Sequence, residues 1–182
     1  MKTVKFVRKV FIMSIDSNTQ DDIIESFYRI ISIKRTGILS KESISHPLFK
    51  AAFIETMICL RNLMYHCKEH ATRISFKDDI NCTSSVRDIT GLIEYFRNAL
   101  CHIESPNHYI NSMKFTFNVV VGKAENAVVI NGVNYGGSYE DDICVWVGDQ
   151  KICLVRHVER AFEEAKSLLI PLLDDPRCIL SD

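Results

Sequence analysis

The chain has 182 residues, of which 47% are hydrophobic, and its formal net charge is −1. This length and composition suit one domain with a substantial core, so we expect a single domain over residues 1–182. The nearly balanced charge excludes a broad basic field. Any contact with RNA must therefore be made by a local group of residues.

Seven cysteines are scattered along the chain, mostly within apolar stretches. Their odd number and their spacing favour reduced, buried side chains in a cytoplasmic protein. The start of the chain is basic, but its uninterrupted apolar run is only Val10–Met13 and no small-residue cleavage site follows. We therefore expect residues 1–13 to form an amphipathic segment rather than a signal peptide. No stretch reaches the roughly 20 apolar residues of a membrane span, so we expect a soluble protein without membrane contact.

The first half of the chain predicts three helices. The polar cluster at residues 16–19 caps a helix that ends near Thr36-Gly37. A long central helix begins near residues 45–47 and runs to about Cys67. A third helix, capped by residues 83–85, runs to about Ile103. Its apolar stripe consists of Ile89, Leu92, Ile93, Phe96, Leu100 and Ile103.

After residue 107 the apolar period changes from about 3.6 to 2. Met113, Phe115, Phe117 and Val119 alternate with polar residues, which predicts a strand that carries all four on one face. Asn131-Gly132 and Gly148-Asp149 predict two hairpins.

A last helix begins near Val155 and ends near Pro171. Its opening residues Arg156, His157, Glu159 and Arg160 either line a functional cleft or form solvated first turns, and the second is the more typical. We predict a mainly α fold of the α+β class: a helical bundle over about 16–105 and 155–173, with an antiparallel sheet of four or five strands inserted at about 112–154.

The third helix carries three polar residues that its packing does not require. Arg97 lies about 100° from the centre of the apolar stripe, while Asn98 and His102, four residues apart, point away from it. These three are the candidate site residues. An Arg, Asn and His on the outer face of a helix are otherwise most often a solvated surface.

The same spacing occurs once more, at Arg61, Asn62 and His66 on the central helix. Because Ile54 and Ile58 lie on the polar side of that helix, this copy is either a second site or a buried polar network bonded to neighbouring helices. Antiparallel packing of the two helices would put the two sets at opposite ends, up to about 30 Å apart. We therefore do not expect them to form one site within a protomer.

The segment Phe96-Arg97-Asn98-Ala99-Leu100-Cys101-His102 resembles the signature of the HEPN superfamily, in which a polar residue follows an Arg and a His comes four to six residues after that Arg. The resemblance covers about residues 20–105 and implies a HEPN-like helical bundle. Many members are metal-independent endoribonucleases of toxin–antitoxin and anti-phage defence systems. Some have a Tyr two residues after the His, where this chain has Glu104.

The resemblance implies that RNA is cleaved by attack of its 2′-hydroxyl on the adjacent phosphate, leaving a 2′,3′-cyclic phosphate. His102 would be the general acid or base, Arg97 the phosphate clamp and Asn98 a positioning group. One His leaves a second proton transfer unassigned. Members of the family pair so that their motifs face each other, so we predict a homodimer with Arg97 and His102 near its two-fold axis, and an antitoxin as a further partner.

Other functions stay open at this point. A non-catalytic HEPN-like module that binds RNA, a nucleotide or a protein is favoured by the modest charge of the chain. Zinc would need more ligands than His66, Cys67 and His70, and the chain has no matching Cys-x-x-Cys pair. We therefore expect no metal and no cofactor.

Overall fold

The computed structural model describes residues 15–175, which form a mixed α and β structure. The expectation for residues 1–13 lies outside this range. Four α-helices occur in the described part of the chain: α1 (Ser17–Arg35), α2 (Phe49–His70), α3 (Ile89–Cys101) and α4 (Arg160–Leu169). No helix within 15–175 combines the length and the apolar character that crossing a membrane requires.

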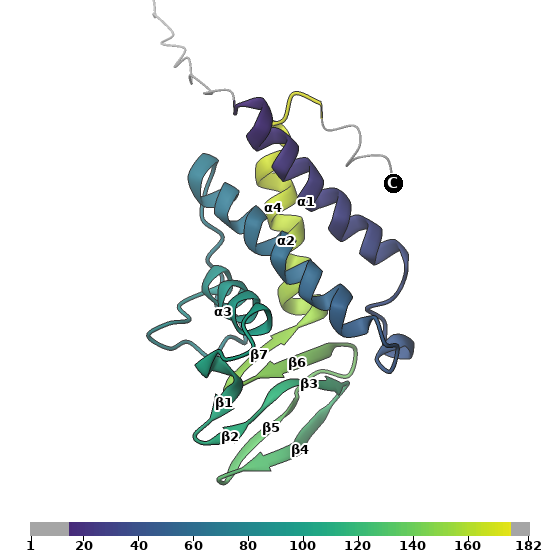
Figure 1. The fold of residues 1–182 in the computed structure, drawn as a ribbon, viewed down its shortest axis with the longest axis vertical. Coiled ribbons are helices and arrows are strands. Elements are labelled where there is room, and N and C mark those ends of the chain that lie inside the picture. The colour runs from purple at the N-terminus through teal and green to yellow at the C-terminus, as the bar shows by residue number, and fades with distance from the viewer. Residues whose placement is uncertain (1–14, 176–182) are drawn as a thin grey trace, which may run out of the picture.

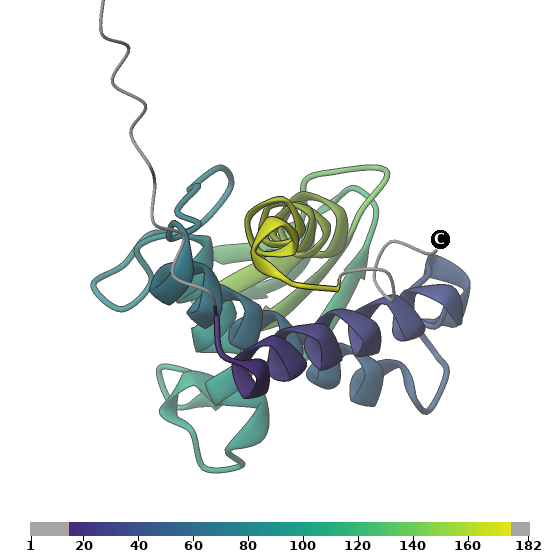
Figure 2. The same cartoon turned by 90° about the horizontal axis from the view of Figure 1, so that it is seen from above.

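Helix α2 is the central helix that the sequence predicted. It packs against α1, α3 and α4, and Figures 1 and 2 show α4 behind α1 and α2 with α3 to one side. Asp16 caps α1 by accepting a hydrogen bond from the Thr19 amide, and α1 ends where predicted, before Thr36. Phe27, Phe53, Leu60 and Phe96 are fully buried between these helices.

Helix α3 is shorter than predicted at both ends. Its N-cap is Asp88, whose carboxylate accepts the Gly91 amide proton and forms two hydrogen bonds with the Arg73 guanidinium, at 2.9 and 2.8 Å. The predicted cap at residues 83–85 was therefore wrong. The helix ends at Cys101, so the apolar stripe stops before Ile103, which is 86% exposed.

The β-rich part follows α3 and forms three small antiparallel sheets rather than the predicted single one. The strands β3 (Thr116–Val121), β6 (Ile143–Val147) and β7 (Gln150–Cys153) form a three-stranded sheet in the order β3-β6-β7. The short strands β1 (Tyr109–Ile110) and β2 (Met113–Lys114) pair with each other, as do β4 (Ala124–Ile130) and β5 (Val133–Gly137).

Both predicted hairpins are confirmed. Asn131 and Gly132 join β4 to β5 with φ angles of 52° and 78°, and Gly148 begins the turn between β6 and β7 with a φ angle of 56°. A Cβ atom on Gly148 would lie 2.4 Å from the Asn107 carbonyl oxygen. Glycine is therefore needed at this turn for space as well as for its backbone conformation.

A bulge at Phe117 overturns the expected alternation of β2 and β3. Phe117 has a φ angle of 53°, and the pairing of β3 with β6 shifts between Thr116 and Asn118. The extra residue sends neighbouring aromatic side chains to opposite faces. Phe117 packs against Phe53 in the helical core, whereas Phe115 packs against Tyr135 in a small second core under the β4–β5 hairpin.

The last helical segment begins with a π-helical turn, Leu154–Glu159, before α4. The buried carboxylate of Asp142 accepts hydrogen bonds from the backbone amides of Val155 and Arg156 and from the Arg156 guanidinium. This negative charge stabilises the positive end of the helix. His157 was expected in a solvated turn, but it is only 1% exposed because its side chain lies between this turn and β7.

The expectation that all cysteines are reduced and buried was wrong for several of them. Cys144 and Cys153, directly opposite each other on β6 and β7, form a disulfide, and Cys82 and Cys101 are exposed. Cys59 and Cys67 are buried thiols, and burial raises the pKa of each to about 12. Cys178 lies outside the described residues.

His157 should make stability depend on pH. Its Nδ1 accepts the Cys153 amide proton and its Nε2 contacts the Asp78 carbonyl, so the folded protein holds the neutral ring, and burial lowers the pKa of His157 below its ordinary value of 6.5. Because the unfolded chain binds this proton more readily, the contribution of His157 is complete above about pH 6.5 and declines as the pH falls below it.

We expect His157→Gln to lower stability at neutral pH but to flatten the loss of stability between about pH 7 and pH 5. Urea unfolding followed by circular dichroism at several pH values measures both effects. Equal pH slopes for the variant and the wild type would contradict this assignment.

Candidate active site

His102 is the C-terminal cap residue of α3, so its imidazole lies at the end of the helix rather than along its side. Its backbone is extended, with φ −121° and ψ 108°, and the residue is exposed. Within residues 15–175 its ring has no hydrogen bond or ion pair. An exposed, unpaired imidazole at the end of a helix is open to a ligand or to a second protein chain.

The loop that follows His102 is held in place by the β-rich part. The Nε2 of His108 donates to the His102 carbonyl oxygen at 2.9 Å, and its Nδ1 lies 2.6 Å from the Thr116 hydroxyl of β3. With Nε2 as the donor, a neutral His108 ring accepts the Thr116 hydroxyl proton at Nδ1. This buried side chain therefore bridges the end of α3 to the sheet.

Tyr95 provides a second attachment from α3 itself. Its hydroxyl lies 3.1 Å from the Asn107 carbonyl oxygen and 3.3 Å from that of Val147, beside Gly148. Burial raises the pKa of Tyr95, so the hydroxyl stays protonated as a donor. The sequence interpretation missed Tyr95 and His108, because the first fits an apolar helix face and the second lies outside the motif.

Arg97 borders a depression of about 300 Å³ at which α1, α2 and α3 meet, and we call this the Arg97 depression. Its wall also includes Asp22 and Ser26 of α1 and Arg61 and Asn62 of α2. The Arg97 guanidinium donates to the Asn98 side chain at 3.1 Å and has no ion pair among the described residues. The expectation that the two motif copies lie far apart was therefore wrong for Arg61 and Asn62, which line the same depression as Arg97.

The first motif copy divides into a buried part and an exposed part. Asn62 donates to Asp22 and Ser26, and His66 Nε2 lies 2.9 Å from the same Asp22 carboxylate. The hydrogen bonds from Asn62 and then His66 lower the pKa of Asp22. His66 Nδ1 is buried and has no hydrogen-bond partner among residues 15–175, so neither ring nitrogen is open to a substrate. The polar-network interpretation holds for Asn62 and His66, but Arg61 is exposed.

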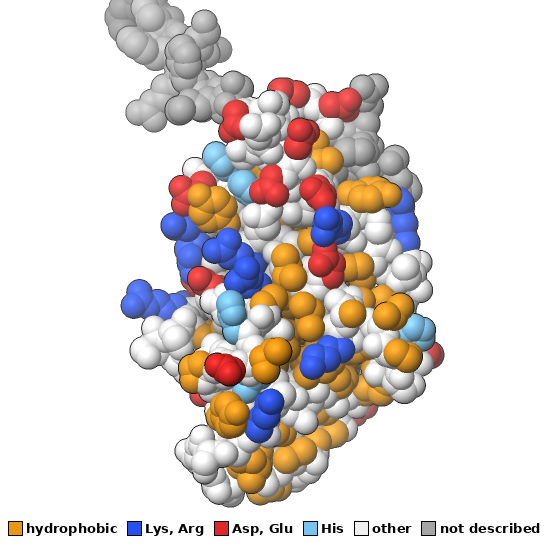
Figure 3. Space-filling view, in the orientation of Figure 1, with side chains coloured by type: hydrophobic (Ala, Val, Ile, Leu, Met, Phe, Trp, Pro, Cys, Tyr) orange, Lys and Arg blue, Asp and Glu red, His pale blue; other side chains and the backbone are white. Residues whose placement is uncertain are grey.

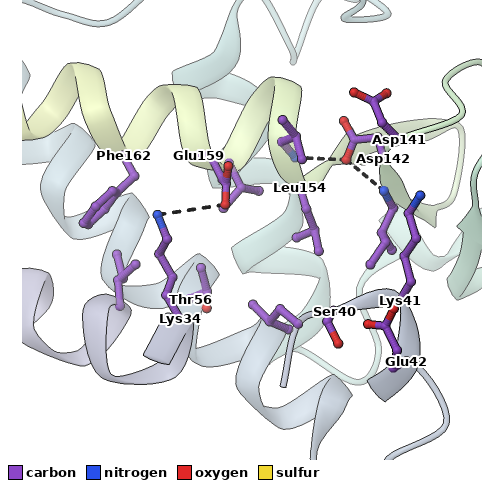
Figure 4. Close-up of a pocket in the computed structure, with 15 residues that line it drawn as sticks. Lys34, Ser40, Lys41, Glu42, Thr56, Asp141, Asp142, Leu154, Glu159 and Phe162 are labelled. Atoms are coloured by element: carbon purple, nitrogen blue, oxygen red, sulfur yellow. Dashed lines mark hydrogen bonds and ion pairs between the residues drawn. The ribbon is translucent and has the colours of Figure 1, made fainter. Parts of the chain in front are cut away.

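A separate cavity of about 310 Å³ lies between α1, α4 and the start of β6, and none of the predicted site residues line it (Figure 4). Its charged groups already have partners. Lys34 pairs with Glu159 at 3.9 Å, Lys41 donates to the Glu140 carbonyl, and the Asp142 carboxylate accepts backbone amide protons. These charged side chains therefore serve to hold the neighbouring elements together, and we do not assign them a catalytic role.

Three comparisons were made, with protein-family models, with curated proteins and with solved structures, and none gives a match to this chain. The likeness to the HEPN superfamily therefore rests on the motif alone. No group of three or more His, Cys, Asp or Glu residues within 15–175 is arranged to hold a metal ion.

The two motif histidines should differ in their effect on stability. His66→Ala removes a buried ring and a hydrogen bond to Asp22, so we expect a loss of about 2 kcal/mol or more in the free energy of unfolding. His102→Ala changes an exposed side chain and should stay within about 0.5 kcal/mol of the wild type. Chemical denaturation of both variants measures the difference. Similar losses for the two would show that one of these placements is wrong.

Proposed function

We propose that this protein is a metal-independent endoribonuclease of the HEPN type, with Arg97 and His102 as its catalytic residues. The observation that carries the proposal is the accessibility of both groups within the Arg-Asn-x-x-x-His motif. Arg97, near the end of α3, has no ion pair within residues 15–175, and the imidazole of the cap residue His102 is exposed. In the copy at Arg61, Asn62 and His66, by contrast, the imidazole of His66 is buried. This contrast favours the second copy as the reactive one.

The proposed reaction needs only acid–base chemistry. The 2′-hydroxyl loses its proton and its oxygen attacks the neighbouring phosphorus, while the bond from phosphorus to the 5′-oxygen breaks and that oxygen gains a proton. The products are a 2′,3′-cyclic phosphate and a 5′-hydroxyl. A histidine can transfer protons near neutral pH, and a guanidinium can offer two parallel donors to the phosphate as its charge grows.

We further propose that the active form is a homodimer, since one His102 cannot easily perform both proton transfers. Two exposed apolar side chains support this. Ile103 follows His102 directly and is 86% exposed, and Ile58 is 37% exposed on the border of the Arg97 depression. A two-fold partner that covers them would bring a second His102 close to the first. A toxin or defence role, with an antitoxin partner, belongs to the same proposal.

The purified protein should cut total RNA or tRNA in the presence of EDTA and leave 2′,3′-cyclic phosphate ends. We expect His102→Ala to slow cleavage about 10²- to 10⁴-fold and Arg97→Ala about 10²- to 10³-fold. His70→Ala, which removes an exposed histidine outside both motifs, is the matched control and should cut at the wild-type rate. Cleavage is read on gels, with end-group analysis of the products.

Each part of the proposal can be contradicted by a separate result. Wild-type protein that binds RNA but leaves it uncut would favour the non-catalytic RNA-binding module. Cleavage by His102→Ala at the wild-type rate would exclude His102 from the reaction. Light scattering that shows a monomer at micromolar concentration would reject the dimer.

A further inference from the structure

A second depression adjoins the Arg97 depression, and the two share Arg61. It measures about 270 Å³ and lies between α2 and the beginning of α3, with Tyr65 and Thr90 among its lining residues; we call it the Tyr65 depression. Arg61 therefore lies between the two depressions, and we call them together the α2–α3 groove. Figure 3 shows Lys and Arg side chains gathered over this part of the surface.

The carboxylates that line the Arg97 depression already have hydrogen-bond or ion-pair partners within the chain. Asp22 accepts hydrogen bonds from Asn62 and His66, and Glu25 pairs with Arg29, which also binds Glu55. Arg61 and Arg97, in contrast, have no ion pair among the described residues. The two guanidiniums therefore remain available to an anion from outside the chain.

The Tyr65 depression is mainly basic. It contains Arg61, Lys68 and Arg73 with a single acidic residue, Glu94. Arg73 is committed to Asp88, and Lys68 forms an exposed pair with Glu69 at 3.2 Å, a kind of pair that binds weakly. The lining of the two depressions together thus has five basic and three acidic side chains, on a chain whose formal net charge is −1.

Tyr65 adds a flat aromatic surface to this groove. The residue is 47% exposed, and the Arg61 guanidinium lies 5.8 Å from the centre of its ring. Exposed aromatic rings beside cations are the surfaces on which proteins stack the bases of single-stranded nucleic acid. An acidic protein segment would use the cations but would gain little from the ring.

We propose that this groove binds single-stranded RNA next to the reacting phosphate: Arg61 contacts a neighbouring phosphate and Tyr65 stacks a base. The inference rests on the proposed function and adds its substrate class. In duplex RNA the bases are stacked on each other and cannot reach Tyr65. The first motif copy thereby serves substrate binding through Arg61, while its Asn62 and His66 serve packing.

The test uses the full chain with His102→Ala, which keeps bound RNA uncut, and measures anisotropy of a labelled single-stranded oligoribonucleotide over a range of salt concentrations. Adding Tyr65→Ala should weaken binding about 5- to 150-fold, whereas Tyr65→Phe should retain it. Adding Arg61→Ala should weaken binding and reduce the salt slope by about 0.7. A duplex of the same sequence should bind more weakly than the single strand.

Tyr28→Ala is the matched control, because Tyr28 is 57% exposed on α1 and lines neither depression. It should bind as tightly as its parent. If Tyr65→Ala and Arg61→Ala bind RNA like the parent while the wild type still cleaves it, the groove proposal fails and the proposed function stands. If the wild type neither binds nor cuts RNA, both fail. If a polyglutamate peptide binds the groove and RNA does not, its partner is an acidic protein and the proposal is overturned.

Discussion

The candidate site depends on one buried side chain, the imidazole of His108. It joins the carbonyl group of His102 to the hydroxyl of Thr116, and so fixes the end of α3 to the three-stranded sheet. Without such an attachment, the residues after a helix end would move freely, and an imidazole at that position would have no defined direction. Tyr95 reinforces the same joint from the preceding turn of α3.

This joint gives the β-rich segment a physical role. Its sheet packs one face into the helical core through residues such as Val145 and Ile152, and the β4–β5 hairpin covers the other face, where Trp146 packs against Tyr135. Both faces are therefore constrained, and the sheet can act as a rigid support for the loop after His102. A helical bundle alone would leave that loop without a neighbour on the side of Asn107.

The elements that the sequence predicted well are those with local signals: the cap of α1 within residues 16–19, the long central helix α2, and the Asn131-Gly132 turn. Errors arose where a distant contact decides the structure. Arg73 selects Asp88 as the cap of α3, and the bulge at Phe117 is fixed by pairing with β6. The motif residues could be read from spacing, but their environments could not, because the burial of His66 and the exposure of Arg61 depend on how α1 and α3 cross α2.

The most direct test of the central claim follows the ring protons of His102 by nuclear magnetic resonance during titration with a short single-stranded RNA whose reacting 2′-hydroxyl is absent. If His102 meets the reacting phosphate, its resonances shift and saturate with the bound RNA, while those of the buried His66 move little. Saturated RNA binding that leaves the His102 resonances unchanged would contradict the claim.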